Sequence, residues 1–149
     1  MSKRYLAIDP GDKRTGLAIG DQASGIATPL DVIEASGNQM LFEQLAKVIG
    51  QQEPDELVVG FPLNMDGSEG PRAKLIGRLA DDLRQRFKLE VHLVDERLST
   101  YEADQRMGQT GLTHRGKKVR RDAQAAAVIL SDFLSALGRG DTEGIGPDP

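Results

Sequence analysis

Several carboxylates stand at the ends of apolar runs, where folding can bring distant side chains together. Asp9 follows YLAI at positions 5–8, Asp95 and Glu96 follow LEVHLV at 89–94, and Asp122 precedes AQAAAVIL at 123–130. Because parallel strands end along a common edge of an α/β sheet, such acids can meet there. Clustered carboxylates repel one another, and hard oxygen ligands select Mg²⁺ or Mn²⁺. Two such ions are a known means of phosphodiester hydrolysis.

Each acid also has an ordinary structural explanation. Asp9 stands before Pro10 and Gly11, a typical turn sequence, and Asp122 could cap the start of a helix. Glu96 could pair with a neighbouring cation. Asp95 and Glu96 are consecutive, so in a strand their side chains would point to opposite faces. The residues alone leave metal binding and these structural roles open.

A cluster of cations directly precedes Asp122 in a chain whose formal net charge is -4. It comprises five of seven consecutive residues: Arg115, Lys117, Lys118, Arg120 and Arg121. Such a run is often only a solvated surface, but beside a metal ligand it would neutralise backbone phosphates, with salt-dependent affinity. Aromatic residues make up only 4% of the chain, which favours phosphate and shape recognition over base stacking.

Apolar periodicity and turn residues predict the elements that position these groups. Pro29 marks its segment as an edge strand or a bulge. Leu75, Leu79 and Leu83 are expected on one buried helix face, and Asp122 at the start of the last helix. We expect strands over 4–9, 15–20, 25–34, 56–60 and 88–96, helices over 38–52, 71–87, 100–108 and 122–137, and a cationic loop over 108–121. Crossover helices then make the later strands parallel to the first. The prediction is a three-layer α/β domain with a mixed sheet.

The composition bounds the class of protein. The chain has 149 residues, 38% of them apolar, and residues 1–138 are predicted to form one domain followed by a flexible tail over 139–149. It contains no cysteine, which excludes disulfides and thiolate metal ligands. His92 and His114 lack a partner at metal-ligand spacing. No run is long enough for a membrane helix and no signal peptide is evident, so we expect a cytoplasmic protein without membrane contact.

Four ordered segments resemble the YqgF/RuvX family of pre-16S rRNA nucleases and Holliday junction resolvases. They are IDPGDKRTGLAIGD, VVGFPLNMDGSEG, VDERLST and KKVRRDAQAAAVIL. The resemblance runs from about Arg4 to Leu137. It implies an RNase H-like fold and phosphodiester hydrolysis dependent on Mg²⁺ or Mn²⁺, with two ions expected. By the same resemblance Asp9, Glu96 and Asp122 are the catalytic metal ligands.

Other residues are candidates for nucleic-acid contact. Thr15 could offer a hydroxyl to a phosphate, and Asn64, in a loop similar to a family motif, could hydrogen-bond a base or sugar. Both could equally be structural. The cationic candidates are Arg97, Lys117, Lys118, Arg120 and Arg121.

The resemblance favours 5′-end processing of pre-16S rRNA, with cleavage of four-way DNA junctions in recombination as the alternative. A junction resolvase needs paired active sites and hence a homodimer, whereas an RNA nuclease could act as a monomer. A non-catalytic nucleic-acid-binding factor would not need the three acids. An ATPase of the actin and sugar-kinase type would need a second lobe, for which this chain is too short.

Overall fold

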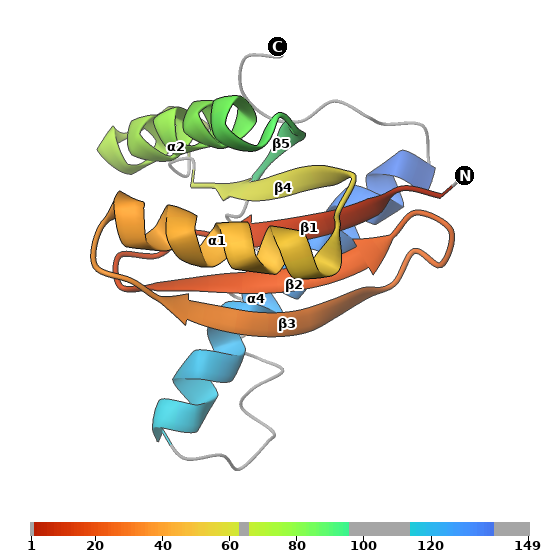
Figure 1. Cartoon of the computed structure of the whole chain (residues 1–149), viewed down its shortest axis with the longest axis horizontal. Coiled ribbons are helices and arrows are strands. Elements are labelled where there is room, and N and C mark those ends of the chain that lie inside the picture. The colour runs from red at the N-terminus through yellow and green to blue at the C-terminus, as the bar shows by residue number, and fades with distance from the viewer. Residues whose placement is uncertain (1, 63–65, 96–113, 139–149) are drawn as a thin grey trace.

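Among the residues that the structure describes, a mixed sheet of five strands lies at the centre (Figure 1). The computed structural model describes residues 2–62, 66–95 and 114–138, with side chains in the last range from Asp122 onward. The strands are β1 (Arg4–Asp9), β2 (Arg14–Asp21), β3 (Ala27–Glu34), β4 (Glu56–Phe61) and β5 (Glu90–Asp95). The helices are α1 (Asn38–Gln52), α2 (Pro71–Phe87) and α4 (His114–Gly138).

The sheet has the strand order β3-β2-β1-β4-β5. β1, β2 and β3 form an antiparallel meander, while β4 pairs in parallel with both β1 and β5. The β2–β3 register shifts between Leu17 and Ala18, next to Pro29. This confirms the expectation of an edge strand with a bulge, because proline cannot donate to the ladder.

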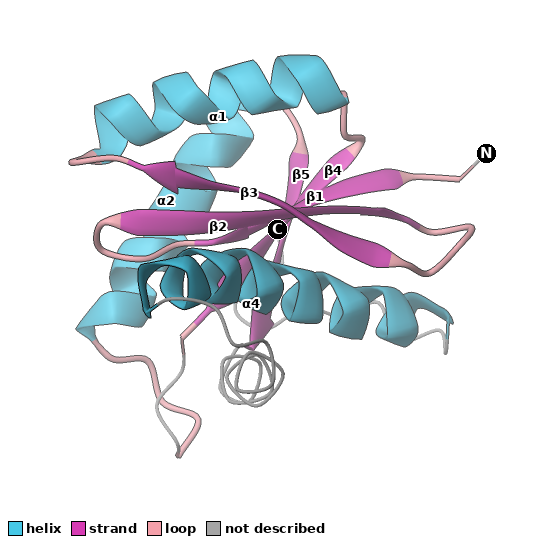
Figure 2. Ribbon diagram, turned by 90° about the horizontal axis from the view of Figure 1, so that it is seen from below, coloured by secondary structure: helices cyan, strands magenta, loops and turns pink. Residues whose placement is uncertain are grey.

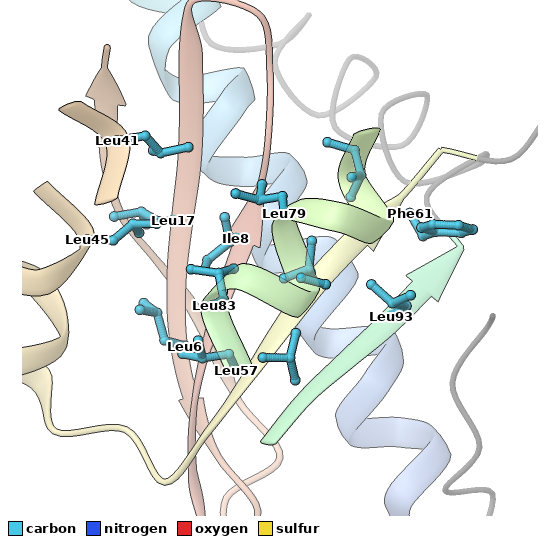
Figure 3. Close-up of a cluster of buried hydrophobic side chains, with 14 of the residues drawn as sticks. Leu6, Ile8, Leu17, Leu41, Leu45, Leu57, Phe61, Leu79, Leu83 and Leu93 are labelled. Carbon is cyan, nitrogen blue, oxygen red and sulfur yellow. The ribbon is translucent and has the colours of Figure 1, made fainter. Parts of the chain in front are cut away.

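Helices cover both faces of the sheet, α1 and α2 on one side and α4 on the other (Figure 2). Residues of alternate parity along each strand therefore enter different cores. Leu6, Ile8 and Leu17 pack with Leu45, Leu79 and Leu83 in the core under α1 and α2 (Figure 3). Tyr5, Ala7, Ala18 and Val58 pack against Ala126, Ile129, Leu130 and Phe133 of α4. The predicted three-layer α/β fold with a mixed sheet is confirmed.

The last helix is longer than the sequence pattern indicated. It begins at His114, so most of the segment expected as a cationic loop is helical and Asp122 lies inside α4 rather than at its start. The helix-capping explanation of Asp122 is therefore wrong. Lysine and arginine are good helix formers, and one glycine, Gly116, costs only about 1 kcal/mol. The apolar face after Asp122 stabilises the whole helix through tertiary packing.

The buried face of α2 also differs from the expectation. Leu75 is 54% exposed, whereas Ile76 is 4% exposed and joins Leu79 and Leu83 in the core. The prediction from leucine spacing was therefore wrong for Leu75, because the buried face also includes Ala73 and Ala80 and is turned toward Ile76. The predicted helix over 100–108 and the predicted tail over 139–149 lie outside the described residues. Within the described ranges, no helix is both long and apolar enough to cross a bilayer.

Candidate active site

The strand alternation places Asp9 on the face that α4 covers. Tyr5 and Ala7 belong to the core against α4, and Leu6 and Ile8 to the core under α1 and α2. Asp9 continues the odd-numbered series and so lies on the α4 face, at the last position of β1. We call the edge at which β1, β4 and β5 end the carboxyl edge. Asp9 is half-buried there.

Gly16 brings α4 to the same place. In the β1–β2 ladder it is the direct partner of Asp9. A Cβ added at Gly16 would collide with the backbone carbonyl of Asp122, so α4 approaches β2 at this point as closely as a backbone can. Facing partners in an antiparallel ladder project to the same face of the sheet. Asp9 and the backbone of Asp122, the first and last of the predicted metal ligands, therefore both lie beside Gly16 at the carboxyl edge, on the α4 face.

Arg14, the first residue of β2, contacts the Asp122 side chain. Its Nε donates to Oδ2 of Asp122 over 3.0 Å, and the two side chains are 26% and 30% exposed. The pairing gives the acid a specific, partly desolvated partner. Arg14 was not among the site residues predicted from the sequence.

Arg72, near the start of α2, holds the turn that follows Asp9. It donates to the backbone carbonyl of Pro10 over 2.9 Å and to the carboxylate of Asp12 over 2.7 Å. The hairpin is therefore tied to α2 through Arg72 and to α4 through Arg14. Two planar guanidinium groups fix the local geometry around Asp9.

Other candidates are placed elsewhere. Asp95 pairs in register with Phe61, and Phe61 and Leu93 both belong to the core under α1 and α2. Asp95 thus lies on the face opposite Asp9 and does not share its site. Thr15 is 3% exposed and precedes Leu17 on that same opposite face, so it is not brought together with Asp9 either.

The remaining candidates are described only in part. Glu96, Arg97 and Asn64 lie outside the described residues, Glu96 being next in the chain after β5. The cationic residues belong to the first turns of α4, which lead directly to Asp122, and only their backbone is described: Lys117, Lys118, Arg120 and Arg121.

A second group of ionisable side chains lies at the amino edge, where β4 and β5 begin. Ligand atoms of Glu56, Glu90 and His92 all lie within 4.8 Å of one another. Glu56 accepts hydrogen bonds over 2.7 Å from His92 Nε2 and over 2.7 Å from Lys3 Nζ. Burial raises the pKa of Glu56, but these two donors outweigh it and hold that pKa below its ordinary value. His92, without a partner by sequence spacing, gains one through the register of β4 and β5.

The donor chemistry distinguishes the two groups as metal sites. Asp9 and Asp122 offer hard carboxylate oxygens at the carboxyl edge, the type of donor that Mg²⁺ and Mn²⁺ require. At the amino edge both oxygens of Glu56 already accept hydrogen bonds, one each from His92 and Lys3. That group also includes an imidazole, which suits other metals, so by donor type the two carboxylates at the carboxyl edge fit Mg²⁺ or Mn²⁺ better.

Comparison with solved structures identifies proteins with a similar fold. RuvC of T. thermophilus in complex with a Holliday junction substrate superposes with a TM-score of 0.59 and 17% identity, over 96% of this chain and 99% of that one. The Fowlpox virus resolvase gives a TM-score of 0.56 with 12% identity, over 90% of this chain and 98% of the other. At such low identity the likeness concerns the fold, which is RNase H-like.

Sequence comparison identifies the family. The family model "RuvX: Holliday junction resolvase" matches residues 3–136. Relatives that carry the name "Putative pre-16S rRNA nuclease" include proteins of Anaeromyxobacter sp., 41% identical over 88% of this chain and 96% of the relative, and of Methylobacillus flagellatus, 42% identical over 89% and 90%. A third, from Escherichia coli, is 37% identical over 90% and 97%. The chain belongs to the RuvX family and is a hydrolytic nuclease.

Proposed function

We propose that this nuclease is an endonuclease that depends on divalent metal and processes the 5′ end of pre-16S rRNA. The catalytic part is supported by the position of Asp9, from β1, and of the Asp122 backbone, from α4, both beside Gly16 at the carboxyl edge. The substrate is proposed from the relatives, which carry the name "Putative pre-16S rRNA nuclease". A cytoplasmic location fits this substrate.

We assign Asp9, Asp122 and Glu96 as the ligands of Mg²⁺ or Mn²⁺, with two ions expected. Bound ions of this kind neutralise charge that develops on a phosphodiester and lower the pKa of water. The chain supplies the orientation: the β1–β2 ladder sets Asp9, and the packing of α4 on Gly16 sets Asp122. Glu96 is included because it directly follows β5, whose last residue lies at the same edge of the sheet.

The cationic start of α4 is proposed as the surface that receives the phosphate backbone. Lys117, Lys118, Arg120 and Arg121 occur just before Asp122 in the same helix, so a strand bound along them would lead to the acids. Arg97 and Asn64 would add contacts to phosphate and to base or sugar. Binding through these groups should weaken steeply with salt, because phosphate neutralisation releases counterions.

Cleavage of four-way DNA junctions is the second candidate, favoured by the description of the matching family model. It requires two active sites acting on one junction, and therefore a homodimer. A monomer that cleaves RNA fully would count against it. Gel filtration at assay concentration determines the oligomeric state.

One preparation tested on both substrates separates the candidates. With Mn²⁺ or Mg²⁺ we expect cleavage of a precursor RNA that spans the 5′ end of 16S rRNA, and weak or no cleavage of a four-way junction at equal concentration. Asp9→Asn should abolish cleavage while it keeps RNA binding in a gel-shift assay. The opposite substrate preference would identify a resolvase, and normal cleavage by Asp9→Asn would overturn the catalytic assignment.

A further inference from the structure

Two residues of one strand face contact the same residue of α4. Arg14 and Gly16 are two positions apart in β2, so they project toward the same side of the sheet. The missing side chain of Gly16 admits the backbone of Asp122, and Arg14 Nε donates to Oδ2 of the Asp122 side chain over 3.0 Å. β2 therefore sets both the position of the Asp122 backbone and the direction of its carboxylate.

Asp122 needs an orienting partner because of its place in the helix. It lies inside α4, where no capping hydrogen bond to the helix start fixes its rotamer. Its side chain is 30% exposed, so core packing alone does not hold it in one direction. A guanidinium group is planar, permanently charged and pre-organised, and it suits the task of holding a carboxylate in one orientation.

We propose that Arg14 is a positioning residue that holds Oδ2 of Asp122 and thereby directs Oδ1 toward a divalent ion. This inference rests on the proposed function, since it takes Asp122 as a metal ligand. Partners that hydrogen-bond a ligating carboxylate orient it, and their loss typically weakens metal affinity about 10–100-fold. Arg14 itself touches neither ion nor substrate in this role.

The sign of the effect separates orientation from simple charge. The guanidinium group is a cation beside a site for another cation, so by repulsion alone its removal would tighten metal binding. Loss of orientation would weaken it. A weaker affinity in a folded variant that lacks Arg14 therefore supports the positioning role and not simple charge.

Mn²⁺ binding to the full chain tests the proposal without reference to cleavage. Free Mn²⁺ is measured by electron paramagnetic resonance during titration of wild type, Arg14→Ala, Arg14→Lys and Lys13→Ala. We expect Arg14→Ala to raise the dissociation constant about tenfold or more. Arg14→Lys should give an intermediate loss, because lysine keeps the charge but offers a flexible point donor. Unchanged or tighter binding by Arg14→Ala overturns the proposal.

Lys13→Ala is the matched control. Lys13 is the exposed neighbour of Arg14 on the same hairpin, and its removal changes the net charge equally. Its dissociation constant should stay within about twofold of wild type, since charges exposed to solvent are screened. A tenfold loss in this variant would show that any change in the hairpin weakens metal binding, and it would overturn the specific role of Arg14.

Asp9→Asn and Asp122→Asn in the same titration distinguish the two possible failures. If both bind Mn²⁺ like wild type, the metal site of the proposed function is wrong. If both lose Mn²⁺ while Arg14→Ala keeps it, only the role of Arg14 fails. In the Asp122→Asn background, Arg14→Ala should have no further effect. The thermal melting of each variant in EDTA shows whether it folds. If Arg14→Ala does not fold, Arg14→Lys decides the outcome, and a Mn²⁺ affinity equal to that of wild type overturns the proposal.

Discussion

At the carboxyl edge the acids come from β1 and α4, and Arg14 of β2 donates a hydrogen bond to one carboxylate oxygen of Asp122. At the amino edge Glu56, 7% exposed, has each of its oxygens bonded, one to Lys3 and the other to His92. Both groups of carboxylates lie on the α4 side of one sheet. Only the group at the carboxyl edge includes a residue, Asp122, that directly follows the cation-rich first turns of a described helix. An acidic cluster alone therefore does not mark an active site, and its donor types and the charged segments beside it must be considered as well.

The aromatic neighbours reinforce this difference. The ring centroid of Phe133 lies 4.9 Å from that of His92 and 5.1 Å from that of Tyr5. The pair of Glu56 and His92 is thus built into the packing of α4 on the sheet. These contacts stabilise the packing of α4, and at the carboxyl edge Asp9 and Asp122 are only half-buried.

Removal of one acid at each edge should give the largest contrast. We expect Asp122→Asn to lower the cleavage rate by more than about 100-fold, because the loss of a ligand exceeds the loss of a residue that only orients one. Glu90→Gln, at the amino edge, should stay within about threefold of wild type. Single-turnover cleavage of the precursor RNA measures both. A comparable loss in Glu90→Gln would move the active site to the amino edge.

The close approach of α4 should make Gly16→Ala strongly destabilising. The new methyl group would meet the backbone of Asp122, which cannot turn aside as a side chain does. We expect a loss of about 3 kcal/mol or more in the free energy of unfolding, measured by urea denaturation. Gly50→Ala is the control: its Cβ would meet nothing within 4 Å in α1, so it should add about 0.5–1 kcal/mol. Equal effects would show that Gly16 does not set the helix position.

The hydrogen bonds at the amino edge should appear in the pH dependence of stability. The pKa of Glu56 is lowered in the folded protein, so its contribution is present above the ordinary value of 4.5 and is lost as the pH falls below it. Glu56→Gln should cost about 1–3 kcal/mol near pH 7 and show a smaller further loss in acid. Unfolding in urea at pH 7 and pH 3.5 measures this. Glu43→Gln, on the exposed face of α1, should change stability by less than about 0.5 kcal/mol.

Much of the carboxyl edge was predictable because its signals are local. Asp9 ends an apolar run before Pro-Gly, and small residues at every second position of β2, Gly16, Ala18 and Gly20, could have indicated a helix packed closely on that face. The Ala-rich part of α4 is the complementary signal. Arg14 gave no such signal, since an arginine beside a turn is ordinary and its partner lies far along the chain.

The sequence by itself determined the order of the described elements, the mixed sheet and the family, because apolar periodicity, turn residues and motif spacing are properties of neighbouring positions. Only the tertiary structure decided that Asp122 lies inside α4, that Asp95 faces away from Asp9, and that Glu56 and His92 pair at the amino edge. Helix length and strand register depend on packing between segments that are distant in the chain. The free energy of that packing cannot be predicted from a pattern of neighbouring residues.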